Sequence, residues 1–325
     1  MSVRPIAIIG AGIAGLSCAV RLREAGVPVE VIEKSRSPGG RAGTCGGDGW
    51  QCDHGAQYFT ARDPDFVAEV ERWLETGVVA TWTPRLAVFD GTRMHPRISD
   101  EKRFVARPRM STLGRHLAAG LSLRENTRVT ALAHDVEDWL LDTEEHGRLE
   151  PYSGVVVTVP APQASAMLAS VASELAQVAA DAPMHGCWAL IARFDNDPRL
   201  DFDAAFVNHG ALSWVARDSS KPDRPDGHTW LLHAPVEGDL GGESEVELAR
   251  IATSMLRAFG DLGAPPPDDW VLHRWRFAHS PDAPVIGAQW DADARIGLAG
   301  DWLMGGRIEG AWLSGRKLAE HILAG

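Results

Sequence analysis

The 325-residue sequence has few cysteines, few tyrosines and a shortage of positive charge. Its four cysteines include no Cys-x-x-Cys pair, so they predict neither a disulfide framework nor a metal site. Lysine and arginine number 32 against 44 acidic residues, and the net charge of −12 disfavours nucleic acids and anionic membranes as partners. No apolar run approaches the ~20 residues of a membrane-spanning helix, and no export signal is recognisable. We therefore expect a cytoplasmic protein without a bound metal.

The rest of the composition is that of an ordinary folded protein. Hydrophobic residues make up 45% of the chain and charged residues 23%, which excludes disordered, collagen-like and coiled-coil classes. At roughly 150 residues per domain, the length predicts about two domains.

The first forty residues predict a dinucleotide-binding unit. The apolar run Ile6–Ile9 predicts a buried parallel strand, and the glycine-rich segment 10–15 follows it directly. A helical pattern then ends at Gly26, and a second strand is expected at Val29–Ile32. A strand, a glycine turn, a helix and a strand in this order are typical of a dinucleotide site.

Each part of this unit has a physical task. Gly10 permits the tight turn, Gly12 lets a pyrophosphate approach the backbone, and Gly15 lets the helix pack on the strand. The helix N-terminus offers free N–H donors and a partial positive charge to the phosphates. Glu33 can accept hydrogen bonds from both ribose hydroxyls, and its charge disfavours a 2′-phosphate. The predicted contacts of this unit are Gly10, Gly12, Ile13, Ala14, Gly15, Glu33 and Lys34.

A second glycine motif decides between NAD and FAD. Gly39-Gly40-Arg41 resembles the motif with which the amine oxidase group of two-dinucleotide-binding-domain flavoproteins contacts the FAD pyrophosphate. Its glycines allow a close approach, and Arg41 offers a planar fork of donors to phosphate oxygens. We therefore expect FAD, bound in part by Gly40 and Arg41. Monoamine oxidases attach FAD through a cysteine near the C-terminus, but no cysteine follows Cys187 here, so we expect non-covalent binding.

The C-terminal region supplies the other half of the expected site. Ile296–Ala299 predicts a short buried strand that ends in Gly300-Asp301, and the apolar spacing predicts a closing helix from about Ile308. In FAD proteins of this kind, the Gly-Asp pair meets the ribityl chain and the helix N-terminus points at the flavin pyrimidine ring. The helix dipole would there stabilise the negative charge of a reduced flavin. The predicted contacts of this region are Gly300, Asp301, Ile308, Glu309 and Ala311.

Together, these motifs give the chain a resemblance to the renalase family of flavoproteins. The matching segments are 39–41, Asp53-His54-Gly55-Ala56-Gln57-Tyr58-Phe59-Thr60, 219–222, 300–302 and 305–311. The resemblance implies an α/β fold of p-hydroxybenzoate-hydroxylase-like topology, with a Rossmann-type FAD domain and an α+β substrate domain that holds an antiparallel sheet. It implies oxidation of the 2- or 6-dihydro isomers of NAD(P)H to NAD(P) by hydride transfer to FAD N5, with O2 reoxidising the flavin to give hydrogen peroxide. It also adds Gly55, Ala56, Gln57 and Val129 as FAD contacts.

The two domains are expected to interleave along the chain. The FAD domain is expected to be discontinuous, with the limits 1–75, 108–165 and 280–325. The substrate domain is expected at 76–107 and 166–279. Segments 188–194 and 230–234 are rich in sheet-forming residues and predict strands. Segment 218–227 is dense in serine, proline and aspartate, so we expect an exposed, mobile loop there.

The chemistry expected of this site needs no catalytic acid or base. A dihydropyridine is already a hydride donor, and its transfer requires proximity and alignment. His185 precedes a predicted strand, and the family resemblance implies that such a residue lies over the flavin face; Arg97 suits a dinucleotide phosphate. Packing or solvent exposure is an open alternative for these side chains. The predicted substrate contacts are Tyr58, Phe59, Thr60, Pro96, Arg97, His185 and Trp302.

Two other functions stay open. An FAD-dependent amine oxidase acting on a small amine would share both FAD motifs. Such enzymes enclose the amine in an aromatic cage of tyrosines and tryptophans, and a cage with two tyrosines would need both Tyr58 and Tyr152, unless tryptophans replace them. A non-catalytic dinucleotide-binding protein would hold FAD without turnover. A flavin hydroxylase is disfavoured, because such enzymes follow Gly-Asp with Ala-Ala-His, where this chain has Trp302-Leu303-Met304.

Overall fold

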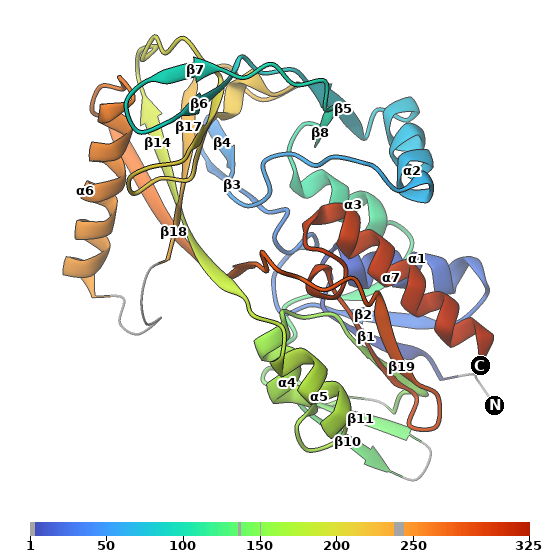
Figure 1. Cartoon of the computed structure of the whole chain (residues 1–325). Helices are drawn as coiled ribbons and strands as arrows, with labels where there is room; N and C mark the ends of the chain where they lie inside the picture. Colours follow the sequence, from blue (N-terminus) through green and yellow to red (C-terminus); the bar gives the residue numbers. More distant parts are fainter. Residues whose placement is uncertain (1–3, 136–137, 150, 237–243) are drawn as a thin grey trace.

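The computed structural model describes residues 4–135, 138–149, 151–236 and 244–325, and they form two lobes, each with its own β-sheet (Figure 1). The first lobe has a six-stranded sheet in the order β19-β20-β13-β1-β2-β9, parallel except between β19 and β20. Its strands are β1 (Ile6–Ile9), β2 (Val29–Ile32), β9 (Ser122–Arg124), β13 (Gly154–Val157), β19 (Ala288–Asp291) and β20 (Ile296–Ala299). The strands predicted around the glycine motif and before Gly300 are therefore confirmed.

Helices and a small meander cover the two faces of this sheet. Ile6 and Ile8 of β1 pack on one face and Ala7 and Ile9 on the other, so the whole strand is apolar. The helices of the first face are α1 (Ile13–Glu24), α3 (Ser111–Ala118) and α7 (Arg307–Ala324). The elements of the second face are β10 (Val129–Asp135), β11 (Asp138–Thr143), β12 (Gly147–Arg148), α4 (Ala161–Leu168) and α5 (Ser173–Ala180).

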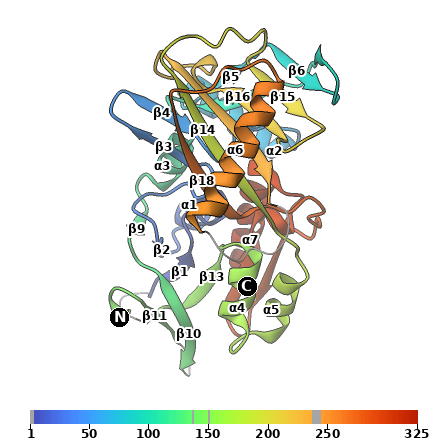
Figure 2. The ribbon, with the colours of Figure 1, turned by 90° about the vertical axis from the view of Figure 1, so that its left-hand side faces the viewer.

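The second lobe is built on a seven-stranded sheet in the order β18-β14-β17-β16-β15-β6-β7 (Figures 1 and 2). Its neighbours are antiparallel except β15 and β6, which run parallel. Helix α6 (Glu245–Asp261) packs its buried residues on this sheet. The sheet strands are β6 (Leu86–Phe89), β7 (Met94–Pro96), β14 (His185–Phe194), β15 (Ala204–Val207), β16 (Trp214–Arg217), β17 (His228–Pro235) and β18 (Asp269–His279). The strands predicted at 188–194 and 230–234 lie within β14 and β17.

Short elements join the two lobes. Cys52 of the hairpin β3–β4 packs on Ala189, Ile191 and Leu231 of the second sheet, although the hairpin follows the glycine motifs of the first lobe. The remaining elements are β3 (Thr44–Gly47), β4 (Trp50–Asp53), α2 (Pro64–Glu75), β5 (Val79–Trp82), β8 (Arg103–Ala106), and the 3-10 turns η1 (Asp218–Ser220) and η2 (Asp301–Leu303). In the described part of the chain, no helix has the length and apolar character of a membrane span, and no three metal-ligating side chains gather as a metal site would require.

Two long strands carry the chain from one lobe to the other. β14 begins at His185, directly after the helices of the first lobe, and β18 ends at His279 before the chain returns to β19. These two residues are paired in the sheet. Both strands reach from the second sheet toward the first lobe (Figure 1). The two crossings therefore lie side by side.

Candidate functional site

The glycine turn after β1 leaves an open place in front of a helix N-terminus. Gly12 is the N-cap of α1, and no side chain caps this helix end or places a negative charge in its first turn. A Cβ atom at Gly12 would meet nothing within 4 Å, whereas one at Gly15 would lie 2.1 Å from the carbonyl oxygen of Gly10. Gly10 itself has a φ of +106°. The free N–H groups of Ile13 and Ala14 therefore face a space that suits a pyrophosphate.

Glu33 is held beside this turn by backbone donors. It is buried at the end of β2, and its two carboxylate oxygens accept from the N–H groups of Ala11 and Ser35, both at 2.8 Å. Lys34, by contrast, is exposed. Val129 begins β10 close by, because the N–H of Thr127 donates to the carbonyl of Glu33 at 2.9 Å. The carboxylate is thus oriented before any ribose hydroxyl reaches it.

The Gly-Gly-Arg motif packs directly on the glycine turn. The N–H of Gly39 donates to the carbonyl of Ala11 at 2.8 Å. Gly40 is exposed, has a φ of +53°, and a Cβ atom on it would lie 3.4 Å from the Cα of Gly12. The two motifs therefore form one continuous glycine surface.

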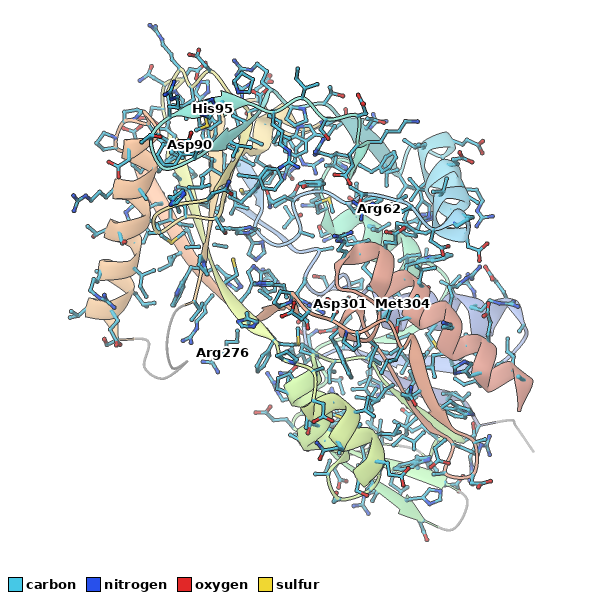
Figure 3. The ribbon with its side chains drawn as sticks, in the orientation of Figure 1. Arg62, Asp90, His95, Arg276, Asp301 and Met304 are labelled. Carbon is cyan, nitrogen blue, oxygen red and sulfur yellow. The ribbon has the colours of Figure 1, made fainter. Side chains whose placement is uncertain are left out.

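Arg41 and Asp301 join the N-terminal and C-terminal halves of the site. The guanidinium donates to both carboxylate oxygens of Asp301, at 2.5 and 3.0 Å, across 260 residues of sequence. It also donates to the carbonyl of Ala278 at the end of β18, at 3.1 Å. Gly300 precedes this pair at the end of β20, as predicted. Figure 3 shows Asp301 between the two lobes.

The segment Gly55-Ala56-Gln57 lies against the backbone of Arg41. The N–H of Ala56 donates to the carbonyl of Arg41 at 2.9 Å. A Cβ atom at Gly55 would lie only 2.0 Å from the same oxygen, so no side chain fits there. The predicted FAD contacts at 10–15, 40–41 and 55–57 thus belong to one neighbourhood.

Helix α7 presents a second uncapped N-terminus. It begins at Arg307, within one residue of the prediction, and no side chain caps Gly306 before it. A cavity of about 260 Å³ opens there, lined by Arg62, Met304 and the first turn of the helix. Figure 3 labels Arg62 and Met304 near this helix. Ile308 and Ala311 are buried in the core beneath it. The carboxylate of Glu309 accepts through Oε1 from the N–H groups of residues 62 and 63, which ties the start of the helix to this segment.

These features fit FAD. Two uncapped helix N-termini supply donors and partial positive charge, and the glycine surface between them admits a pyrophosphate. Glu33 stands ready for the adenosine ribose, and Asp301 lies where the ribityl chain is expected.

Three predicted substrate contacts lie elsewhere than expected. Phe59 is buried, and its ring packs on Phe66 and Trp73, so it belongs to the core. Trp302 is fully buried and donates its indole N–H to the carbonyl of Val159, so it is no pocket wall. Pro96 is exposed on the outermost strand β7, beside His95, which Figure 3 shows far from Asp301. Position in an irregular or edge segment does not reveal which way a side chain faces.

Tyr58 belongs to an aromatic group between the lobes. Its half-buried ring lies 6.0 Å from that of Trp82 and 5.7 Å from that of Trp214, and the guanidinium of Arg103 sits 5.5 Å above it. Thr60, two residues on, is half-buried. A tyrosine pair is excluded, because the only other tyrosine is buried in the layer on the far face of the first sheet.

A second cavity, of about 200 Å³, adjoins this aromatic group. It is lined by Trp82, Arg97, Arg103 and several neighbours from the loop between β7 and β8. Arg97 is exposed and stacks on the ring of Phe206 at 4.7 Å. This places one predicted phosphate-binding residue beside the aromatic group.

His185 lies at the crossing between the lobes. Its ring is exposed and lies 5.7 Å from that of His279. Burial, with the nearby charges of His185 and Arg41, lowers the pKa of His279. His185 is therefore close to the Arg41–Asp301 pair.

A buried charged cluster was missed by the sequence reasoning. Segment 218–227, expected as an exposed loop, instead buries Asp218, Lys221 and Arg224. Their partners are Asp53 and Gln57 of the first-lobe motif. Burial favours a high pKa for Asp53, but Lys221 and Arg224 outweigh it and lower the pKa to about 2. Segment 219–222 stood out only through its resemblance to the renalase family, and its composition indicated exposure instead of burial.

Two neutral imidazoles lie beside the same segment. His233 donates its Nε2–H to the backbone oxygen of His54 at 3.1 Å, and Trp275 donates its indole N–H to that oxygen at 2.9 Å. Burial lowers the pKa of each histidine from 6.5 to about 4. Both rings are therefore uncharged at neutral pH.

Comparisons with known sequences agree with this geometry. The model of an NAD(P)-binding Rossmann-like domain matches residues 8–72. Phytoene desaturase (lycopene-forming) of Pantoea ananas is 40% identical over 68 residues, and phytoene dehydrogenase of Streptomyces griseus is 41% identical over 64 residues. These matches cover 21% and 20% of this chain, but only 13% and 12% of those relatives.

Solved structures match over the whole chain. A putrescine oxidase covers 100% of both chains with a TM-score of 0.73 and 15% identity. Cyclohexylamine oxidase from Brevibacterium oxydans IH-35A covers 99% of both chains with a TM-score of 0.72 and 14% identity. The shared fold is that of a mixed α/β, FAD-dependent oxidoreductase, and FAD is the cofactor. The model of flavin containing amine oxidoreductases matches residues 72–323, and the chain belongs to that family.

Proposed function

We propose that this flavin-containing oxidoreductase is a renalase-like oxidase of the 2- or 6-dihydro isomers of NAD(P)H. Bound FAD supplies the acceptor for a hydride from the dihydropyridine ring, and O2 takes both electrons to give hydrogen peroxide, so NAD(P)⁺ is the product. The motif at 53–60 supports the renalase resemblance. The observation that carries the proposal is the cationic cavity beside Tyr58.

The charges of this cavity favour an anionic substrate. Arg97, Lys102 and Arg103 line it, together with Asp100 and Glu101. The carboxylate of Glu101 is already paired with Arg62 and lies 3.7 Å from Arg103. Arg97 therefore stays available for a dinucleotide phosphate, which a guanidinium binds through two parallel hydrogen bonds. The three cations of the lining outnumber its two carboxylates, so the cavity favours an anion over a cationic amine.

The aromatic group would align the reacting ring. Tyr58, Trp82 and Trp214 offer flat apolar faces of the kind on which a nicotinamide or adenine can stack. Tyr58 follows the FAD-contact segment 55–57 by one residue, so a ring stacked there stays close to the flavin. Orientation of this kind is the main demand of hydride transfer, and the side chains supply it without donating or removing a proton.

An amine oxidase is the second candidate. The putrescine and cyclohexylamine oxidases among the structural neighbours act on amines, and the aromatic group around Tyr58 could enclose a small amine. A non-catalytic FAD-binding protein is the third. It has no specific observation in its favour.

An anaerobic reduction assay separates these functions. The purified holoprotein is mixed in turn with 2-dihydro-NAD, 6-dihydro-NAD, ordinary NADH and putrescine, and the oxidised-flavin absorbance is followed. Rapid bleaching by either unusual isomer, with slow bleaching by the amine, supports the proposal. Bleaching by the amine alone makes the protein an amine oxidase, and no bleaching by any of them refutes the dinucleotide oxidase.

Four further properties are part of the proposal. The topology would be p-hydroxybenzoate-hydroxylase-like, and the domain limits would be those expected from the sequence, except that residues 166–180 stay with the FAD domain because α4 and α5 pack on the first sheet. The protein would act in the cytoplasm. Its partners would be the dinucleotide substrate and O2, without nucleic acid or membrane, in keeping with the net charge of −12.

A further inference from the structure

Lys221 is a fully buried cation that comes from the second lobe and reaches into the first. Its side chain is 0% exposed, and its ammonium group donates to three acceptors. These are Asp218 Oδ1 at 2.9 Å, Gln57 Oε1 at 3.1 Å and Asp53 Oδ2 at 3.2 Å. An ammonium has three donors, so all of them are used.

Charge compensation of Asp53 does not by itself explain the position of this lysine, which is also paired with the buried Asp218. Arg224 is also buried and already donates to Asp53 Oδ2, at 2.6 and 3.2 Å. Thr44 and the N–H of Met110 bind the other oxygen of Asp53. Asp53 therefore has a cationic partner without Lys221. What Lys221 adds is the ion pair with Asp218 and the contact with Gln57.

That contact decides how the amide of Gln57 is turned. A lysine can only donate, so it selects the orientation in which Oε1 faces Lys221 and the NH₂ group faces away. The NH₂ group then donates to the backbone carbonyls of Asp53, at 2.5 Å, and Gly55, at 3.1 Å. With the amide reversed, its oxygen would face two carbonyl oxygens and both hydrogen bonds would be lost.

The peptide between Gly55 and Ala56 is consequently held from both sides. Gln57 binds its carbonyl, and the carbonyl of Arg41 accepts from its N–H at 2.9 Å. Arg41 belongs to the Gly-Gly-Arg motif, so the segment is tied to the glycine surface at one end. Lys221 ties it to the second lobe at the other.

We propose that Lys221 is a positioning residue for the flavin, acting through Gln57 on the backbone of segment 53–57. This inference rests on the proposed placement of Gly55–Gln57 against FAD. Lys221 is also 5.8 Å from the centre of the Trp82 ring, which lines the cationic cavity. One buried side chain thus connects the wall of the substrate cavity with the flavin-contact segment.

The chain offers a matched control for this role. Lys221→Met removes the ammonium group but keeps an unbranched side chain. Arg224→Met is the control, because Arg224 is the other buried cation that binds Asp53 but does not contact Gln57. Both variants of the holoprotein are expected to unfold at a lower temperature, because each leaves buried charge uncompensated. Only Lys221→Met is expected to raise the FAD dissociation constant, by about tenfold or more, and to shift the visible flavin spectrum toward that of free FAD.

A second variant covers the case in which Lys221→Met does not fold. Gln57→Leu leaves all four charges of the cluster in place and removes the bonds to Asp53 and Gly55, so it should change FAD affinity and the flavin spectrum in the same way. The proposal is overturned if Lys221→Met, or Gln57→Leu in its place, keeps a wild-type spectrum and affinity, or if Arg224→Met changes both as strongly. Neither readout uses a substrate, so a failed dihydro-NAD assay would leave this result standing.

Discussion

Substitution by alanine should have different effects at Gly12 and Gly15: at Gly12 it should weaken FAD binding but not stability, and at Gly15 it should destabilise the fold. Gly12→Ala adds a Cβ that meets nothing within 4 Å, at a residue whose φ of −75° any amino acid adopts. Alanine is a poorer N-cap than glycine, which lowers the free energy of unfolding, but it also reduces the entropy of the unfolded chain, which raises it. Each effect is about 0.5–1 kcal/mol, so the free energy of unfolding should hardly change. Gly15→Ala instead drives a Cβ to 2.1 Å from a backbone oxygen, which the turn cannot accommodate.

The effect of Gly12→Ala on FAD should be large. The added methyl group occupies the open space that the pyrophosphate needs, so the free N–H donors of α1 can no longer reach it. Two charge-assisted hydrogen bonds at about 1.5–3 kcal/mol each amount to roughly 3–6 kcal/mol. At about 1.4 kcal/mol per tenfold, the dissociation constant of FAD should rise by roughly 10²–10⁴.

Urea unfolding of the apoproteins and FAD titration by flavin fluorescence test this pair. Gly12→Ala should unfold like the wild-type apoprotein and bind FAD poorly, and Gly15→Ala should be strongly destabilised or insoluble. Wild-type FAD affinity in a well-folded Gly12→Ala protein would refute the reasoning, because the pyrophosphate could not then lie at this turn.

Three further variants test other parts of the site. Arg41→Ala should lower FAD retention after gel filtration, since it leaves the predicted ribityl contact Asp301 without its bidentate ion pair; undiminished retention would remove Arg41 from the site. Glu33→Ala should weaken FAD and cost roughly 3 kcal/mol of unfolding free energy through two unpaired N–H groups; equal affinity by titration would count against a ribose contact. His233 has its pKa lowered from 6.5 to about 4, so its stabilising effect is complete above pH 6.5 and declines as the pH falls toward 4. Between pH 6.5 and 5 the wild-type protein should lose about 2 kcal/mol of unfolding free energy through His233. His233→Gln should remove this loss, as measured by urea unfolding at several pH values. An unchanged pH dependence in the variant would contradict the lowered pKa of His233.

Local patterns predicted the frame of the FAD site well. β1, the turn at Gly10–Gly15, α1 and β2 are consecutive in sequence, and their glycine and apolar spacing reflects backbone geometry alone. The same holds for β20 and the start of α7 at Arg307. Each glycine of the first motif meets one local requirement of the backbone, so its role can be predicted from its place in the motif.

Long-range pairing could not be predicted in the same way. Asp53 and Lys221 are 168 residues apart, and nothing near either residue indicates the other. The segment around Lys221 has the composition of a surface loop, and only the buried partners in the first lobe make it an interior one. The burial of Phe59 and Trp302 could not be predicted for a related reason. Neither residue lies in a long periodic element, whose pattern would show whether a side chain faces the core or a pocket.

The packing of α7 on α1 has a consequence for how the protein is made. Ser17 donates its hydroxyl to the carbonyl of Trp312 at 2.8 Å, and Gly315 lies so close to Ala14 that a Cβ there would be 2.1 Å from its carbonyl oxygen. Synthesis proceeds from the N-terminus, so the glycine turn and α1 leave the ribosome long before their partner helix does. Until α7 has been made, the side of α1 at Ala14 and Ser17 therefore lacks its partner. Because the start of α7 also belongs to the expected FAD site, we expect chains truncated before α7 to accumulate without bound FAD.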